Sequence, residues 1–199
     1  MKRASRMALL AALGLAGCTA DYAKVGNAPV LLIIAAISPN PMSSEVLLGG
    51  GICPDFATLA VANRSKNPNV TVPQVPQAII VNRYEVSYFR SDGRAQQGVD
   101  VPFSISGALT ASFDAKTSGT DDVTIEVVRR QAKLEPPLIQ LVQENPQFGG
   151  QALIVTMFAK ITLYGQTIAG QNVTASANMQ IDFADYIDTG TFDGCDVPD

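Results

Sequence analysis

Histidine and tryptophan are both absent from this 199-residue sequence, and cysteine occurs only three times. Without histidine, the chain cannot build a Ser-His-Asp or Cys-His catalytic centre or a histidine-ligated metal site. It also lacks the Gly-x-Ser-x-Gly and Ser-x-x-Lys motifs of common serine hydrolases and penicillin-binding enzymes. We therefore expect no catalytic residue, no bound metal and no cofactor. A glycosidase-like pair of carboxylates remains the alternative, although no motif identifies one.

Charge is also sparse, because charged residues make up 16% of the chain and hydrophobic residues 47%. This balance is typical of a folded protein and excludes a disordered one. The segment before Cys18 holds three of the 14 basic residues and no acidic residue, so 11 basic residues face 18 acidic ones after it, a net charge of −7. Nucleic-acid binding depends on clustered basic residues, so we expect no nucleic-acid partner.

The N-terminus has the three-part plan of a secretory signal. Basic residues at positions 2, 3 and 6 precede an apolar run over 7–15, and the run ends in Leu15-Ala16-Gly17-Cys18. This ending resembles the lipobox of bacterial lipoproteins, which implies acylation of the Cys18 thiol and cleavage just before it. The alternative is an ordinary cysteine beyond a conventional cleavage site. A membrane-spanning helix needs about 20 apolar residues, more than this run provides.

The lipobox resemblance divides the chain into a signal peptide over 1–17, a lipidated tether over 18–28 and a single domain over 29–199. In proteins of this kind, an aspartate after the acylated cysteine often signals retention in the inner membrane. Thr19 stands there instead. The resemblance therefore implies a cell-envelope location on a lipid anchor, in the outer membrane where the cell has one, with the protein on its periplasmic or surface side.

Cys53 and Cys195 are the cysteines that remain once Cys18 carries lipid. Outside the cytoplasm, we expect them to form one disulfide between an early loop and the C-terminal tail. Two unpaired thiols are the alternative. A zinc site is not expected from two cysteines without histidine.

Several segments are patterned as β-strands. The continuous apolar run 30–37, bounded by prolines, indicates a strand buried on both faces or a short buried helix, and its β-branched residues favour the strand. Alternation over 79–90 indicates a strand with one buried face, followed by an Asp-Gly turn. Its Tyr84-x-Val86-x-Tyr88 pattern resembles fibronectin type III and related immunoglobulin-like domains.

The longest alternating segments are 153–163 and 173–183, which predict an antiparallel hairpin joined by a loop over 165–170. Ile154 and Phe158 break the polarity of its first strand, so we expect that strand to be central or covered. The segment 136–145 has apolar residues at helical spacing and is the one predicted helix. We therefore predict an all-β fold, an immunoglobulin-like antiparallel β-sandwich of about seven strands with one short helix.

Aspartates crowd the C-terminal tail, and Asp185, Asp188, Asp193 and Asp196 are the weak calcium candidates among them. Calcium takes six to eight oxygen ligands, which clustered aspartates in a rigid loop provide. The EF-hand pattern is not met, however. The alternative interpretation is a solvated acidic tail held by Cys195.

These observations favour a lipid-anchored envelope protein with a non-enzymatic binding or scaffolding role. Its expected partners are the membrane, through the lipid, and an envelope protein or glycan. An envelope hydrolase or a carbohydrate-binding module is the alternative. A surface aromatic platform or a pocket with converging carboxylates would favour that alternative, whereas a featureless acidic surface would favour scaffolding.

Overall fold

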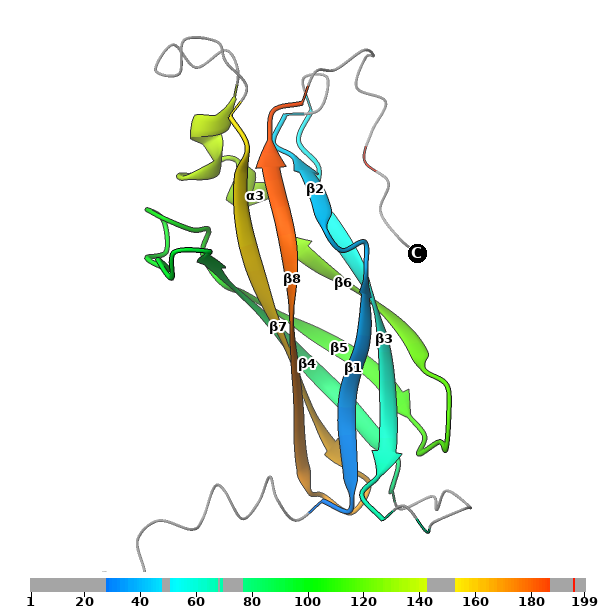
Figure 1. The fold of residues 1–199 in the computed structure, drawn as a ribbon. Coiled ribbons are helices and arrows are strands. Elements are labelled where there is room, and N and C mark those ends of the chain that lie inside the picture. The colour runs from blue at the N-terminus through cyan, green and yellow to red at the C-terminus, as the bar shows by residue number, and fades with distance from the viewer. Residues whose placement is uncertain are drawn as a thin grey trace, which may run out of the picture.

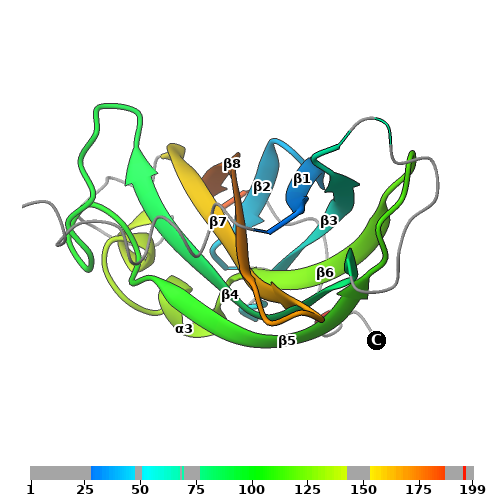
Figure 2. The same cartoon turned by 90° about the horizontal axis from the view of Figure 1, so that it is seen from below.

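A computed structural model of the protein describes residues 28–47, 51–67, 69, 77–142, 153–186 and 195. Within these ranges, the strands form two facing sheets (Figures 1 and 2). The three-stranded sheet has the order β1 (Val30–Ser38), β3 (Asp55–Ser65) and β6 (Asp121–Val128). The five-stranded sheet has the order β2 (Met42–Glu45), β8 (Asn172–Ala184), β7 (Val155–Thr167), β4 (Ile79–Arg90) and β5 (Ile105–Phe113). The all-β sandwich expected from the sequence is confirmed.

The chain changes sheets between β1 and β2. Pro39 and Pro41 lie in this link, and because proline has no N–H to donate to a ladder, the first strand leaves its sheet here. β2 then pairs parallel with β8, while the other strand pairs of the larger sheet are antiparallel. The prediction of a purely antiparallel sandwich is therefore wrong for this one pair. With β2 and β5 counted as additional edge strands, the order agrees with an immunoglobulin-like plan, because β4, β7 and β8 adjoin in one sheet and β1, β3 and β6 form the other.

The strand formed by the apolar run 30–37, β1, is buried on one face only. The strand itself is confirmed, but only one of its faces is buried, because Leu31 is 46% and Ile33 38% exposed. Val30 and Leu32 alternate with them and lie in the core. The expectation that β1 is buried on both faces is therefore wrong.

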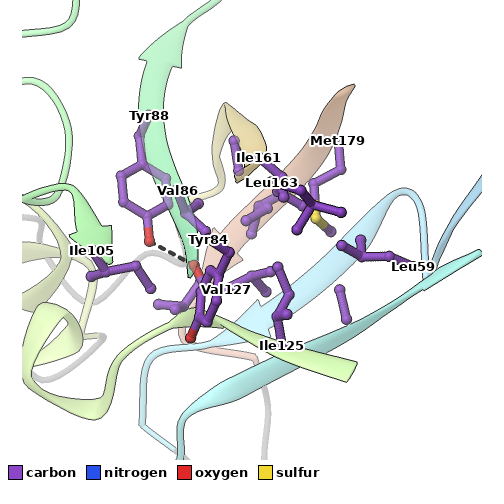
Figure 3. Packing of buried hydrophobic residues seen from close by; sticks show 14 of the residues in the cluster. Leu59, Tyr84, Val86, Tyr88, Ile105, Ile125, Val127, Ile161, Leu163 and Met179 are labelled. Atoms are coloured by element: carbon purple, nitrogen blue, oxygen red, sulfur yellow. Dashed lines mark hydrogen bonds between the residues drawn. The ribbon is translucent and has the colours of Figure 1, made fainter. Parts of the chain in front are cut away.

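The core lies between the two sheets and consists of the alternate, inward-facing residues of both (Figure 3). Ile161, Leu163 and Met179 come from the larger sheet and pack towards Leu59 and Ile125 of the smaller one. The sheets are also joined by a hydrogen bond at 2.6 Å from the hydroxyl of Tyr88 on β4 to the carbonyl of Val127 on β6. Burial raises the pKa of Tyr88, so this hydroxyl keeps its proton and remains a donor.

The predicted hairpin is confirmed as β7 and β8, paired in continuous register, and β7 is central in its sheet. The predicted loop was too long, because β7 continues through Gly165 to Thr167. Gly165 belongs to the strand for a steric reason: a Cβ there would lie 2.7 Å from the carbonyl oxygen of Ile80 on the neighbouring strand. A glycine within a strand thus indicates close backbone approach here rather than a turn.

Truncating Ile161 to alanine is expected to lower the free energy of unfolding by about 2–5 kcal/mol, because the side chain is fully buried and its loss leaves a cavity. The neighbouring Thr162 faces outwards and shares only an exposed hydrogen bond with Ser176. Thr162→Ala should therefore change stability by about 0.5 kcal/mol or less. Urea unfolding of both variants measures this contrast, and similar losses at the two positions would contradict the assigned strand faces.

The predicted helix over 136–145 is wrong. Instead, a single α-helical turn, α3, covers Arg130–Lys133, and a 3₁₀ turn, η2, covers Leu138–Leu141. The two prolines at 136 and 137 cannot donate backbone hydrogen bonds, so α3 cannot continue into this segment. In a 3₁₀ turn, residues three apart share a face, so Leu138 and Leu141 are both buried without an α-helix. Residues 143–145 lie outside the described ranges.

Candidate functional site

Of the three cysteines, two are placed by the structure. Cys53, just before β3, forms a disulfide with Cys195 in the C-terminal tail, with a Cα–Cα distance of 5.4 Å. The disulfide predicted from the cysteine count is therefore confirmed, and the alternative of two unpaired thiols is not. Cys18, the predicted lipidation site, lies outside the described residues, so its acylation stays a prediction.

The calcium candidates are only partly placed. Asp185 is buried just after β8, with 7% of its surface exposed, whereas Asp188, Asp193 and Asp196 lie outside the described residues. Among the residues that the structure describes, no group of three or more acidic, cysteine or histidine side chains lies close enough to hold a metal ion. The calcium hypothesis stays a prediction, because three of its four candidate ligands lie outside the described residues.

The outer face of the five-stranded sheet presents an ordered array of side chains. We use "outer face" for the outward residues of β4, β7 and β8, which the strand register aligns in four rows of three. The rows are Phe89-Phe158-Gln180, Ser87-Lys160-Asn178, Glu85-Thr162-Ser176 and Arg83-Tyr164-Thr174. Aromatic, amide and hydroxyl groups dominate these rows, so this face is not the featureless acidic surface that would favour a purely structural role.

Two aromatic rings form a plate in the first row. The rings of Phe89 and Phe158 have centroids 5.4 Å apart and planes inclined by only 21°, and both side chains are half-buried. Beside them lies a shallow hollow of about 370 Å³, lined also by Met179 and by the amides of Asn40, Asn178 and Gln180. The sequence contained a signal for this feature, since Phe158 interrupts the polar side of its strand.

Asn40 fixes the edge of this hollow. It lies in the link between β1 and β2, and its side-chain oxygen accepts a hydrogen bond at 3.1 Å from the backbone N–H of Gln180. The carboxylate of Asp182 accepts two hydrogen bonds from the Gln180 amide and one from the hydroxyl of Thr156. The change of sheets therefore positions a polar rim beside the aromatic plate.

The fourth row contains a second aromatic group. The guanidinium of Arg83 lies 3.8 Å from the centre of the Tyr164 ring, and the Tyr164 hydroxyl donates a hydrogen bond of 3.0 Å to Glu85. Partial burial, and then the hydrogen bond to the Glu85 carboxylate, raise the pKa of Tyr164, so the phenol stays protonated. Arg83 and Glu85 also form an ion pair at 3.6 Å. The polar groups of Arg83, Glu85 and Tyr164 therefore already pair with one another at this end of the outer face.

Carboxylates do not converge on the outer face. Glu85 lies in the third row, whereas Asp182 lies one step beyond the first row on β8. Three steps of two residues separate these positions along the strands, which corresponds to about 20 Å. Glycosidases place their two carboxyl groups about 5–10 Å apart. This face therefore lacks the arrangement that an acid-base hydrolase needs.

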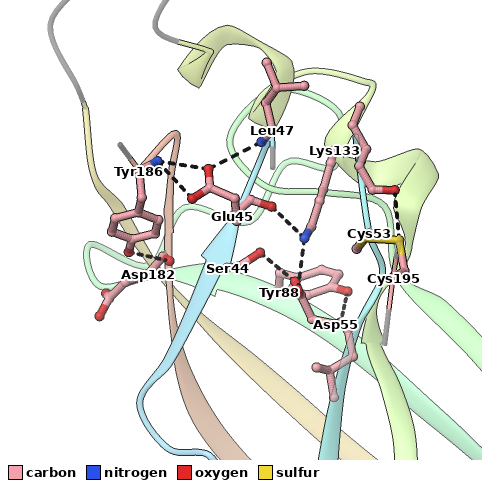
Figure 4. A network of polar contacts seen from close by, with 12 residues as sticks. Ser44, Glu45, Leu47, Cys53, Asp55, Tyr88, Lys133, Asp182, Tyr186 and Cys195 are labelled. Carbon is pink, nitrogen blue, oxygen red and sulfur yellow. Dashed lines mark hydrogen bonds and ion pairs between the residues drawn. A yellow bond between two sulfur atoms is a disulfide. The ribbon is translucent and has the colours of Figure 1, made fainter. Parts of the chain in front are cut away.

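A buried polar cluster lies at one end of the sandwich (Figure 4). Lys133 of α3 is 1% exposed, and its ammonium donates hydrogen bonds to Asp55 of β3 at 2.9 Å and to the backbone carbonyl of Glu45 at 2.7 Å. The hydroxyl of Ser44 on β2 donates to the other oxygen of Asp55 at 2.6 Å. The cluster thus joins α3 to one strand of each sheet.

The contacts of this cluster hold α3, β2 and β3 together. A serine next to a lysine can act as a nucleophile and base, but Ser44 is fully buried and Lys133 is ion-paired with Asp55. Burial raises the pKa of Asp55, although the charge of Lys133 and the hydrogen bonds from Ser44 and Lys133 oppose this. No sequence motif marks this cluster, because its members are far apart in the chain.

No helix in the described part of the chain combines the length and the apolar character needed to cross a bilayer. Comparisons with protein-family models, with curated proteins and with solved structures found no match for this chain.

Proposed function

We propose that this chain is a lipid-anchored protein of the bacterial cell envelope that binds a partner and catalyses no reaction. The observation that carries the proposal is the ending Leu15-Ala16-Gly17-Cys18 after a basic and apolar leader. The lack of histidine and the wide separation of the outer-face carboxylates support a binding role over catalysis. In a cell with two membranes, Thr19 after the acylated cysteine favours the outer one.

The anchor is tested by replacing Cys18 with alanine. Because acyl chains would hold the protein on the bilayer, the variant should lose incorporation of labelled fatty acid and move from the membrane pellet to the soluble fraction. Thr19→Ala, expressed in parallel, keeps the cysteine and should still pellet. A Cys18→Ala variant that pellets as the parent does would refute the lipoprotein assignment.

A second candidate function is glycan binding on the outer face, which the Phe89-Phe158 plate specifically favours. Flat aromatic rings stack against the apolar faces of sugar rings, and planar amides bond neighbouring hydroxyl groups. The hollow beside the plate provides both kinds of group. The side-chain amide of Asn178, which lines the hollow, forms no hydrogen bond to any described residue. An envelope glycan is therefore the partner that we propose for this face.

Soluble oligomers of N-acetylglucosamine and of glucose are the probes for this site. Titration into ¹⁵N-labelled protein should shift amide signals of β4, β7 and β8 near the plate. Phe158→Ala should weaken binding about tenfold or more, the effect of losing about 1.4 kcal/mol at a central aromatic contact. Ile154→Ala removes an exposed apolar side chain before β7 and should leave binding unchanged. Absence of shifts with every oligomer would exclude these glycans.

A further inference from the structure

The described chain begins at one end of the sandwich, the lower end in Figure 1. There the carbonyl of Pro29 accepts a hydrogen bond from the N–H of Lys66, just after β3. The turn between β7 and β8, over 168–170, lies at the same end, and the N–H of Ile168 donates to the carbonyl of Ala78 just before β4. α3 and the start of β7 lie at the opposite end (Figure 1). The turn between β7 and β8 is therefore close to where an N-terminal tether would join.

The length of the tether restricts how the domain can stand on a membrane. If Cys18 carries lipid, ten residue-to-residue steps separate it from Ala28, and these span at most about 33–36 Å. β7 contains 13 residues and extends along most of the sandwich, a length of about 40 Å. The tether is thus too short to let the domain stand with its N-terminal end uppermost and its opposite end on the bilayer.

The N-terminal end has a surface suited to a lipid interface. Ile168 projects from the turn with 56% of its surface exposed, and Ile80, one strand away on β4, is 47% exposed. Among the described residues, the charged ones at this end are Arg64, Lys66, Lys116, Asp114, Asp121 and Asp122. Their formal charges cancel, whereas the chain from Cys18 onwards carries −7. An anionic membrane therefore repels this end less than it repels the rest of the protein, which carries the excess negative charge.

We propose that the turn between β7 and β8 contacts the lipid surface, with Ile168 inserted at the level of the headgroups. This inference rests on the proposed lipid anchor. One isoleucine cannot hold a protein on a bilayer, but the tether keeps the turn at a high effective concentration near the lipid, so a weak contact is sufficient. The contact holds the sandwich upright, with the disulfide, α3 and the Phe89-Phe158 plate directed away from the membrane.

The experiment uses the full-length acylated protein in vesicles of phosphatidylethanolamine and phosphatidylglycerol. A nitroxide is attached at Ile168→Cys, and at Ile154→Cys as the matched control, because Ile154 is equally apolar, is 62% exposed and lies at the opposite end. We expect the label at 168 to collide preferentially with oxygen, which concentrates in lipid. The label at 154 should collide preferentially with a water-soluble nickel complex.

Each other outcome overturns the inference in a distinguishable way. If the protein sediments with vesicles through Cys18 but both labels are equally accessible to nickel, the anchor stands and the contact does not exist. If the label at 168 is shielded from both reagents, a second protein copy covers the turn instead of lipid. If the protein carries no acyl chain, the proposed anchor fails first and the inference falls with it.

Discussion

Replacing Lys133 by methionine is expected to lower the free energy of unfolding by about 3–5 kcal/mol. Methionine is similar in length and retains the packing of the aliphatic stem, but it leaves the Asp55 carboxylate with only the hydroxyl of Ser44 as a described partner. Because the side chain of Asp55 is only 16% exposed, water cannot replace the lost ammonium well. Urea unfolding at neutral pH measures the loss.

The matched control is the double variant Asp55→Asn with Lys133→Met. Removing the carboxylate charge as well eliminates the unpaired buried ion, so the double variant should recover much of the stability lost by Lys133→Met alone. If it is as unstable as the single variant, the effect of Lys133 comes from packing and not from its ion pair.

The same variant should show a characteristic pH dependence. Burial already raises the pKa of Asp55, and removing the charge of Lys133 removes an influence that lowers it, so the pKa rises further. An acid whose folded-state pKa exceeds its unfolded value loses stability as the pH rises through the folded pKa. The stability difference between the parent and Lys133→Met should therefore narrow between about pH 7 and about pH 4. A difference that widens on acidification would contradict this account.

The sequence predicted the strands well where alternation of apolar and polar residues is regular. The strand predicted over 79–90 is observed with the same limits, and the hairpin over 153–183 is observed with longer strands. Alternation succeeds because one face of each strand meets the other sheet and the other face does not. In β1 the residues do not alternate, because both faces of that strand are apolar, so the sequence pattern could not show that only one face is buried.

The candidate sites could be predicted from the sequence only where residue type alone identifies the partners. The disulfide follows from counting cysteines, but the plate requires knowing that Phe89 and Phe158 are opposite each other in register. The cluster around Lys133 depends on a turn that was not predicted and on a change of sheets between β1 and β2. Such contacts join residues up to 88 positions apart, and no single segment contains the information that specifies them.

Removing the disulfide with Cys53→Ser and Cys195→Ser is expected to lower the free energy of unfolding by about 2–5 kcal/mol. The two cysteines are 142 residues apart, so the cross-link closes most of the domain into one loop and greatly restricts the unfolded chain. Urea unfolding measures the loss. The parent protein in reductant should reach the same midpoint as the double variant, which separates the effect of the cross-link from that of the serine side chains.

Adding Lys133→Met to the disulfide-free protein shows whether the disulfide stabilises the protein through the unfolded chain or through the folded cluster around Lys133. Cys53 lies two residues before Asp55, so a cross-link that positions Asp55 for Lys133 would couple to the ion pair. Asp55 is also held by pairing with Val128 and by the hydroxyl of Ser44, and these contacts keep it in place without the disulfide. We therefore expect the two losses to add within about 0.5 kcal/mol, as for independent effects. A clearly smaller cost of Lys133→Met in the disulfide-free protein would show that the cross-link instead shapes the folded cluster.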